Sequence, residues 1–178
     1  MSTVKIKDKT FQTSITEEEI RQRVKVLGQR LSKDLEGKNP LFLSVLNGAF
    51  MFTADLLREM TIPCEVSFVK LASYEGAVST GKVKKLIGLN VDISGRTVVI
   101  VEDIVDTGHT MRQMMESLTH QHPASIHICT LFVKPENLEV DLNIEYAAFE
   151  IPKAFIVGYG LDYDQQGRQL KEVYALAE

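Results

Sequence analysis

Short apolar runs alternate with segments of helical periodicity along most of the chain, and this alternation constrains the fold more than any other feature. Strands that alternate with helices favour a parallel sheet with helices packed on its faces. We therefore predict an α/β fold with a mainly parallel central sheet flanked by helices. The clearest strand-like runs are Leu41–Leu46, Cys64–Leu71, Thr97–Val101 and Ser125–Lys134.

The remaining elements follow from spacing and turn residues. A capping box at Thr16 and Glu19 begins a helix predicted over Glu17–Leu35. A second helix follows Asn47-Gly48, and a third follows Thr110 with a methionine stripe that we interpret as core. Small residues and two glycines indicate a long mobile loop at Ala72–Lys82. Further strands are predicted at Val83–Leu89, Glu145–Ile151 and Phe155–Gly160.

Length and cysteine content limit the organisation of the protein. A chain of 178 residues with 44% hydrophobic residues is sufficient for one core, and it has no repeat or linker. We therefore predict a single domain over residues 1–178. Cys64 and Cys129 lie in apolar runs without CxxC spacing, so both are predicted to be buried free thiols.

Charge and hydropathy argue against two classes of partner. A net charge of −4 disfavours general binding to nucleic acid or to an anionic membrane, because both require a basic surface. The first residues lack the apolar core of a secretory signal, and the chain has no apolar run long enough to cross a bilayer. We expect a cytoplasmic protein with neither a membrane nor a nucleic-acid partner.

The stretch VVIVEDIVDTGHTM, Val98–Met111, concentrates the polar chemistry of the chain. In an open parallel sheet ligands bind beyond the carboxyl ends of the strands, which is where Glu102 and Asp103 are expected. The turn Asp106–Thr110 then leads into a helix whose first N–H groups suit a phosphate. The spacing matches neither a Walker P-loop nor a dinucleotide fingerprint, so a different phosphate-binding loop is indicated.

Two other readings of this stretch are open. Asp106 or Thr107 could simply cap the helix, with Glu102 and Asp103 on a solvated strand edge. The acidic residues could also form a receiver-type pocket that accepts a phosphoryl group. The second reading does not explain the phosphate-cradling turn.

Val98–Met111 closely resembles the phosphoribosyl pyrophosphate signature of the type I phosphoribosyltransferases. The flanking segments SVLNGAFMFTADLL, LASYEGAVSTGKVK, LFVKPEN and FEIPKAFIVGYGLDYDQQGRQL are similar to those of the hypoxanthine-guanine phosphoribosyltransferases, in the same order along nearly the whole chain. The resemblance implies the type I fold with a small base-binding hood. It also implies a Mg²⁺-dependent purine-salvage transferase that moves the 5-phosphoribosyl group from phosphoribosyl pyrophosphate to hypoxanthine or guanine, giving IMP or GMP and pyrophosphate.

The same resemblance assigns roles to the signature residues. Glu102 and Asp103 would meet the ribose hydroxyls and the metal, and Asp106 would act as general acid or base at a purine nitrogen. The 5′-phosphate would be held by the turn Asp106, Thr107, Gly108, His109 and Thr110. His109 stands where many family members carry lysine, so it is interpreted either as a donor near the phosphate or as an exposed loop residue.

Pyrophosphate is assigned by resemblance to Leu46, Asn47 and Gly48, together with Arg168. Family members commonly carry lysine in this short loop, where a non-proline cis peptide can occur, so Asn47 removes a cation while the backbone role remains. Ser73 and Tyr74 match a Ser-Tyr pair on a flap that closes over the reacting centre and excludes water.

The resemblance places the purine against residues from the second half of the chain. Lys134 would donate to the 6-oxygen of hypoxanthine or guanine, and Phe155 would stack on the ring. Ile156 and Asp162 would offer backbone carbonyls near the 2-position, with the Asp162 carboxylate near a second metal. Solvated or core roles remain the structural alternatives for Lys134, Phe155 and Arg168.

Three matters stay open from the sequence. An RNA-binding regulator on the same fold, similar to the pyrimidine-operon attenuation regulators, is the alternative from another functional class, and the acidic balance speaks against it. A transferase that prefers xanthine is the alternative among enzymes, because backbone carbonyls alone do not rank substituents at the 2-position. The family usually forms dimers or tetramers, so we expect a homodimer or homotetramer.

Overall fold

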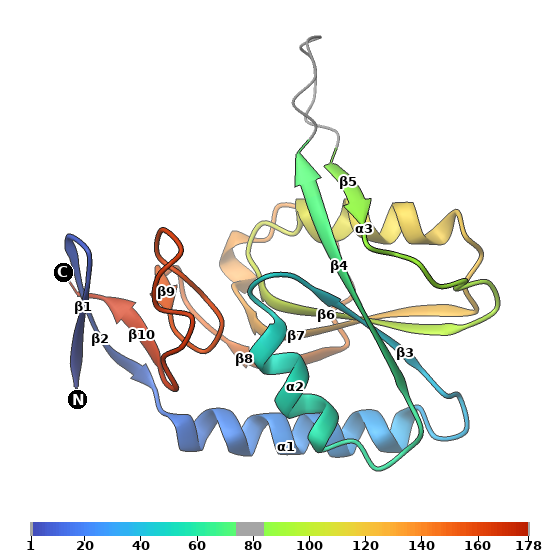
Figure 1. Ribbon diagram of the computed structural model, residues 1–178, viewed down its shortest axis with the longest axis horizontal. Coiled ribbons are helices and arrows are strands. Elements are labelled where there is room, and N and C mark those ends of the chain that lie inside the picture. Colours follow the sequence, from blue (N-terminus) through green and yellow to red (C-terminus); the bar gives the residue numbers. More distant parts are fainter. Residues whose placement is uncertain (1, 74–83, 178) are drawn as a thin grey trace, which may run out of the picture.

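The computed structural model describes residues 2–73 and 84–177, and these form a larger and a smaller sheet (Figure 1). The larger sheet has the strand order β5-β4-β3-β6-β7-β8. Its strands β3, β4, β6, β7 and β8 are parallel, whereas β5 pairs antiparallel with β4. The bounds are Leu41–Val45 for β3, Glu65–Ser73 for β4, Lys84–Ile87 for β5, Thr97–Val105 for β6, Ser125–Val133 for β7 and Tyr146–Glu150 for β8.

Helices cover both faces of the larger sheet. Helix α1 spans Glu17–Asp34 and begins at the predicted capping box, in which the Thr16 side chain accepts from the Glu19 backbone N–H. Helix α2 spans Phe50–Arg58 and packs with α1 on one face, while α3, His109–Thr119, lies on the other. No helix in the described ranges has the length and apolar character needed to span a membrane.

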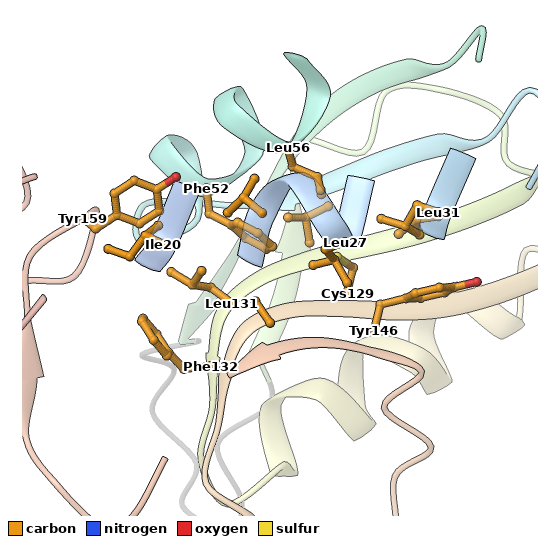
Figure 2. Packing of buried hydrophobic residues seen from close by; sticks show 14 of the residues in the cluster. Ile20, Leu27, Leu31, Phe52, Leu56, Cys129, Leu131, Phe132, Tyr146 and Tyr159 are labelled. Atoms are coloured by element: carbon orange, nitrogen blue, oxygen red, sulfur yellow. The ribbon is translucent and has the colours of Figure 1, made fainter. Parts of the chain in front are cut away.

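Apolar side chains fill both interfaces between helices and sheet. On the α1 side, Leu27 and Leu31 belong to one buried cluster with Phe52 of α2 and Leu131 of β7 (Figure 2). On the α3 side, the methionine stripe packs against the sheet, with Met111 2% and Met114 0% exposed. The prediction that this stripe is core is confirmed.

The smaller sheet is antiparallel and joins the two ends of the chain. It has the order β1-β2-β10-β9, and Figure 1 places it beyond the end of the larger sheet at which β3, β6 and β7 finish. Phe11 and Val157 are fully buried in its own small core. The α/β class and the additional hood are therefore confirmed. The bounds are Thr3–Ile6 for β1, Lys9–Ile15 for β2, Ile156–Val157 for β9 and Val173–Leu176 for β10.

Several expected bounds differ from the structure. Strand β6 continues to Val105 instead of ending at Val101, because its ladder with β7 runs on through the pair Val105 and Val133. Glu102 and Asp103 therefore lie within the strand. Most of the loop predicted at Ala72–Lys82 is outside the described residues, and the first two residues of that range belong to β4.

The cysteine prediction is half right. Both thiols are free. Cys129 is fully buried in β7, where burial raises the pKa of its thiol. Cys64 is only half-buried, because it stands just before β4 at the edge of the core.

Candidate active site

Three loops with predicted functional residues meet at the carboxyl edge of the larger sheet (Figure 1). Gly48 follows β3, the turn at Asp106 follows β6, and Lys134 follows β7. Because β3, β6 and β7 are adjacent and parallel, their carboxyl ends lie at one edge. The topology thus brings together residues that lie far apart in the sequence.

The carboxylates of β6 meet the loop after β3. The Asp103 carboxylate accepts from the Ile104 backbone N–H at 2.8 Å, and the Asp103 N–H donates to Glu102 at 3.1 Å. A Cβ atom at Gly48 would overlap the Asp103 carboxylate. Glycine at this position therefore allows the backbone of one loop to approach the acid of the other.

The turn after β6 surrounds a cavity of about 260 Å³ lined by residues 102–108, 110 and 111. Gly108 is the N-cap of α3 with φ 86°, and a Cβ there would come within 2.7 Å of Val140. Neither Asp106 nor Thr107 forms the cap, so the capping alternative is not supported. The helix N-terminus, with its partial positive charge, lies beside the cavity.

His109 lies on the exposed side of this turn. Its Nε2 is 2.7 Å from the Glu139 carboxylate, and both side chains are more than half exposed. The Glu139 backbone N–H donates to the Thr107 carbonyl at 3.0 Å. The segment after β7 is thereby attached to the turn Asp106–Thr110.

Asp106 is held by two donors. Lys134 Nζ donates to Asp106 Oδ2 at 2.8 Å, and Asn137 Nδ2 donates to Oδ1 at 2.7 Å. The Lys134 ammonium holds the pKa of the Asp106 carboxyl below its ordinary value; burial opposes this effect and Asn137 adds to it. Sequence reasoning named Asp106 and Lys134 but missed Asn137, whose only signal is its place three residues after Lys134.

A loop from the second half of the chain closes on the loop after β3. The peptide bond between Leu46 and Asn47 is cis, as the family resemblance allowed. A Cβ at Gly160 would overlap the Gly48 carbonyl oxygen. Arg168 Nη1 donates to the Gly160 carbonyl at 2.8 Å, and its Nη2 pairs with Asp162 at 2.8 Å. Four of the predicted residues for pyrophosphate and metal, Asn47, Gly48, Asp162 and Arg168, therefore gather here.

Phe155 presents an aromatic face beside the smaller sheet. It is 48% exposed, and its ring lies 6.2 Å from Phe11 and 5.9 Å from Tyr163, centroid to centroid. Its neighbour Ile156 is buried. Sequence reasoning missed both neighbours: Phe11 lies in β2, far from Phe155 in the chain, and no sequence pattern connects Tyr163 with Phe155.

Of the predicted flap pair, Ser73 is the last residue of β4, and Tyr74 lies outside the described residues. A larger cavity, about 520 Å³, lies between α1, α2 and Tyr159. Within the described ranges its lining includes none of the predicted site residues, so we place the chemistry at the smaller cavity beside Asp106.

Comparisons with known proteins agree with this geometry. The profile of the phosphoribosyl transferase domain family matches residues 12–164. The hypoxanthine-guanine phosphoribosyltransferase of Streptococcus thermophilus is 42% identical over 164 residues, which cover 92% of this chain and 91% of that protein. The hypoxanthine phosphoribosyltransferase of Salmonella typhimurium is 42% identical over 167 residues, 92% of this chain and 94% of that protein.

A solved structure gives the same result in three dimensions. The crystal structure of a hypoxanthine-guanine phosphoribosyltransferase from Bacillus anthracis superimposes with a TM-score of 0.86 at 36% identity. The match covers 97% of this chain and 100% of that one. Similarity at this level extends over both sheets, including the smaller one.

Proposed function

The chain belongs to the hypoxanthine-guanine phosphoribosyltransferases, and we propose that Asp106 is the residue that moves the proton in its purine-salvage reaction. A purine nitrogen bonds to the anomeric carbon of the ribose as the bond from that carbon to pyrophosphate breaks. Pyrophosphate leaves with the electron pair, and the purine ring gives up one proton. The observation that supports Asp106 as its acceptor is the carboxylate held beside the cavity by Lys134 and Asn137.

The phosphoribosyl end of the substrate is proposed to occupy the turn after β6. Thr107 and Thr110 supply hydroxyl donors, and the N-terminus of α3 supplies partial positive charge for the 5′-phosphate. Gly108 lets the backbone pack closely against residues 138–142. His109 contributes a donor if its ring turns from Glu139 toward the phosphate.

Glu102 and Asp103 fit a magnesium ion that is shared with the substrate. Mg²⁺ in phosphate-handling enzymes is usually held by one or two carboxylates, with substrate oxygens and water completing the shell. Two adjacent carboxylates beside a phosphate-binding turn supply that donor set. When bound, the ion would neutralise charge on the departing pyrophosphate.

Pyrophosphate is proposed to lie between the loop after β3 and Arg168. Asn47 brings no positive charge, so the guanidinium of Arg168 and the backbone around Gly48 carry the binding. The Asp162 carboxylate pairs with Arg168, and this pair orients the guanidinium. A second metal near Asp162 stays a prediction.

The purine is proposed to lie between Lys134 and the aromatic face of Phe155. The Lys134 ammonium lies 2.8 Å from Asp106 Oδ2, and its N–H donors can turn from there toward the 6-oxygen of the base. Adenine carries an amino group at that position and is a poor acceptor. The carbonyls of Ile156 and Asp162 would contact the 2-position, where hypoxanthine, guanine and xanthine differ.

Three further expectations go with this function. Closure of a flap that contains Ser73 and Tyr74 would exclude water from the reactive sugar. A homodimer or homotetramer is supported by Val66 and Phe68, which are 42% and 45% exposed on one face of β4. A cytoplasmic location stays a prediction.

The direct test is pyrophosphate release with Mg²⁺, phosphoribosyl pyrophosphate and one base at a time: hypoxanthine, guanine, xanthine, adenine or uracil. We expect turnover with 6-oxopurines only, and a fall in kcat of at least about 100-fold in Asp106→Asn, because the amide cannot accept the proton. Equal kcat in wild type and Asp106→Asn would refute the acid-base assignment. RNA binding by a protein without turnover would favour the regulator.

A further inference from the structure

We propose that Asn137 is a positioning residue for the reaction: its side-chain amide fixes one oxygen of Asp106, so that the other oxygen faces the purine. This inference rests on the proposed role of Asp106 as the acid-base group. No role was assigned to Asn137 from the sequence or from the family resemblance.

The two oxygens of Asp106 have different partners. Oδ1 accepts from the Asn137 amide at 2.7 Å, whereas Oδ2 accepts from the Lys134 ammonium at 2.8 Å. The proposed function requires Lys134 to reach the 6-oxygen of the base. Since the Lys134 ammonium then turns toward the base, Oδ2 is the oxygen that becomes available to a purine proton.

Asn137 is suited to stay in place during that change. It ends the short 3₁₀ helix Pro135–Asn137, and its backbone N–H donates to the Lys134 carbonyl at 3.0 Å. The Lys134 N–H donates to the Val105 carbonyl, one residue before Asp106, also at 3.0 Å. The turn that carries Asn137 is therefore attached to the strand that carries Asp106.

A second attachment lies on the other side of Asn137. The Glu139 N–H donates to the Thr107 carbonyl at 3.0 Å, one residue after Asp106. Backbone hydrogen bonds thus bracket the contact on both sides. Pro135 further restricts the turn, because its ring fixes φ. Asn137 is held with less freedom than the long Lys134 side chain.

The chemistry of an amide suits this task. Asparagine donates to a carboxylate without adding a charge, so it orients Asp106 and stabilises its ionised form. Lys134 at the end of β7 and Lys153 between β8 and β9 are the cations that act on Asp106, and the acids of its own strand are Glu102 and Asp103. Removal of Asn137 leaves all four in place.

The effect on pH dependence has a definite sign. The hydrogen bond from Asn137 lowers the pKa of Asp106, so the carboxylate stays ionised to lower pH. Loss of the amide raises that pKa, and the acidic limb of the profile of kcat/KM against pH moves to higher pH. If Asn137 had only a structural role, its loss would lower the amount of folded protein and leave the acidic limb of the pH profile at the same pH.

The experiment compares Asn137→Ala with Asn143→Ala in the full chain, by steady-state kinetics across pH with hypoxanthine. Asn143 is the matched control, because its amide also donates to a carboxylate, that of Glu145, away from the site. For Asn137→Ala we expect kcat lower by about 10- to 100-fold, with KM for phosphoribosyl pyrophosphate within about twofold and the acidic limb displaced upward. Asn143→Ala should match the wild type.

Two further variants keep the proposal testable if Asn137→Ala folds poorly. Asn137→Asp keeps the shape but replaces the donor with a like charge, and it should displace the acidic limb further. In an Asp106→Asn background, Asn137→Ala should lower kcat by less than about twofold, because the two residues act through one group.

Three results would overturn the proposal. The first is an unchanged kcat in Asn137→Ala. The second is a lowered kcat with an unmoved acidic limb in both Asn137→Ala and Asn137→Asp. The third is a fall in kcat on adding Asn137→Ala to Asp106→Asn that is as large as its fall in the wild-type background. Failure of the proposed function looks different, because Asp106→Asn alone would then retain its kcat.

Discussion

The two sheets present very different surfaces to the proposed substrates. The larger sheet offers carboxylates, glycines and a helix N-terminus at the ends of successive parallel strands. The smaller sheet is assembled from the two ends of the chain and lies next to the half-exposed aromatic ring of Phe155. We therefore expect binding of the sugar phosphate to depend on close approach of the backbone, and binding of the base to depend on partly exposed side chains such as Phe155.

Gly160 lies in the loop between β9 and β10 of the smaller sheet, and it approaches the carbonyl of Gly48 in the loop after β3 of the larger sheet. Gly160→Ala should give the largest effect, a loss of about 3 kcal/mol in the free energy of unfolding. The new Cβ overlaps backbone atoms, and φ 103° is unfavourable for alanine. KM for phosphoribosyl pyrophosphate should also rise, because the Gly48 loop is displaced. Urea unfolding and steady-state kinetics measure the two effects.

Gly95→Ala is the matched control. Gly95 also has positive φ, 69°, but a Cβ there meets no atom within 4 Å. Gly95→Ala should lower the free energy of unfolding by about 1 kcal/mol, the cost of alanine at positive φ, and leave KM for phosphoribosyl pyrophosphate unchanged. Equal losses in the two variants would mean that the approach to Gly48 adds nothing to backbone strain.

Replacement of the exposed aromatic ring should have an intermediate effect confined to the base. In Phe155→Ala we expect KM for hypoxanthine to rise by about tenfold, because a stacked base gains about 1–3 kcal/mol from an aromatic partner. Val26→Ala is the control, since Val26 is an exposed hydrophobic side chain, 61%, on α1, which carries none of the predicted site residues. A rise in KM for hypoxanthine that is equally large in Val26→Ala would remove the special role of Phe155.

His109 should give the smallest effect. Its pairing with Glu139 is solvent-exposed, and such pairs contribute at most about 1 kcal/mol, so His109→Ala should change stability little. If the imidazole donates to the 5′-phosphate, His109→Ala should raise KM for phosphoribosyl pyrophosphate several-fold and leave kcat unchanged. Glu139→Ala separates the two roles, because it breaks the pair while leaving the imidazole. An unchanged KM in His109→Ala would leave His109 as an ordinary loop residue.

The same contrast explains what the sequence could predict. Strands β3 and β6 were predicted from short apolar runs, and β4 and β7 from runs in which apolar residues alternate with polar ones. In the smaller sheet only β9 lies in a predicted strand, Phe155–Gly160, which the structure shortens to Ile156–Val157. The local hairpin of β1 and β2 was not predicted, and the pairing of β2 with β10 joins residues far apart in the chain, as in Thr13 with Tyr174. Only the family resemblance indicated a hood.

The candidate site divides in the same way. The turn that begins at Asp106 was predictable, because ligands bind beyond the carboxyl ends of parallel strands, whereas Lys134 was assigned to the site only through the family resemblance. Asn137 was not, since its contact depends on how a 3₁₀ turn folds back onto β6. Likewise, Gly160 was assigned no role, because its approach to Gly48 joins two loops that no sequence pattern connects.

The proposed division of binding between the two sheets is tested most directly by isothermal titration calorimetry. The affinity for phosphoribosyl pyrophosphate is measured with Mg²⁺ and without a base, in the wild type, in Thr107→Val and in Phe155→Ala. Thr107→Val removes a hydroxyl from the turn and should weaken binding by about tenfold or more, as expected for a hydrogen bond to a charged group. Phe155→Ala should bind with the wild-type affinity. The account would be contradicted if Phe155→Ala lost as much affinity as Thr107→Val, or if Thr107→Val lost none.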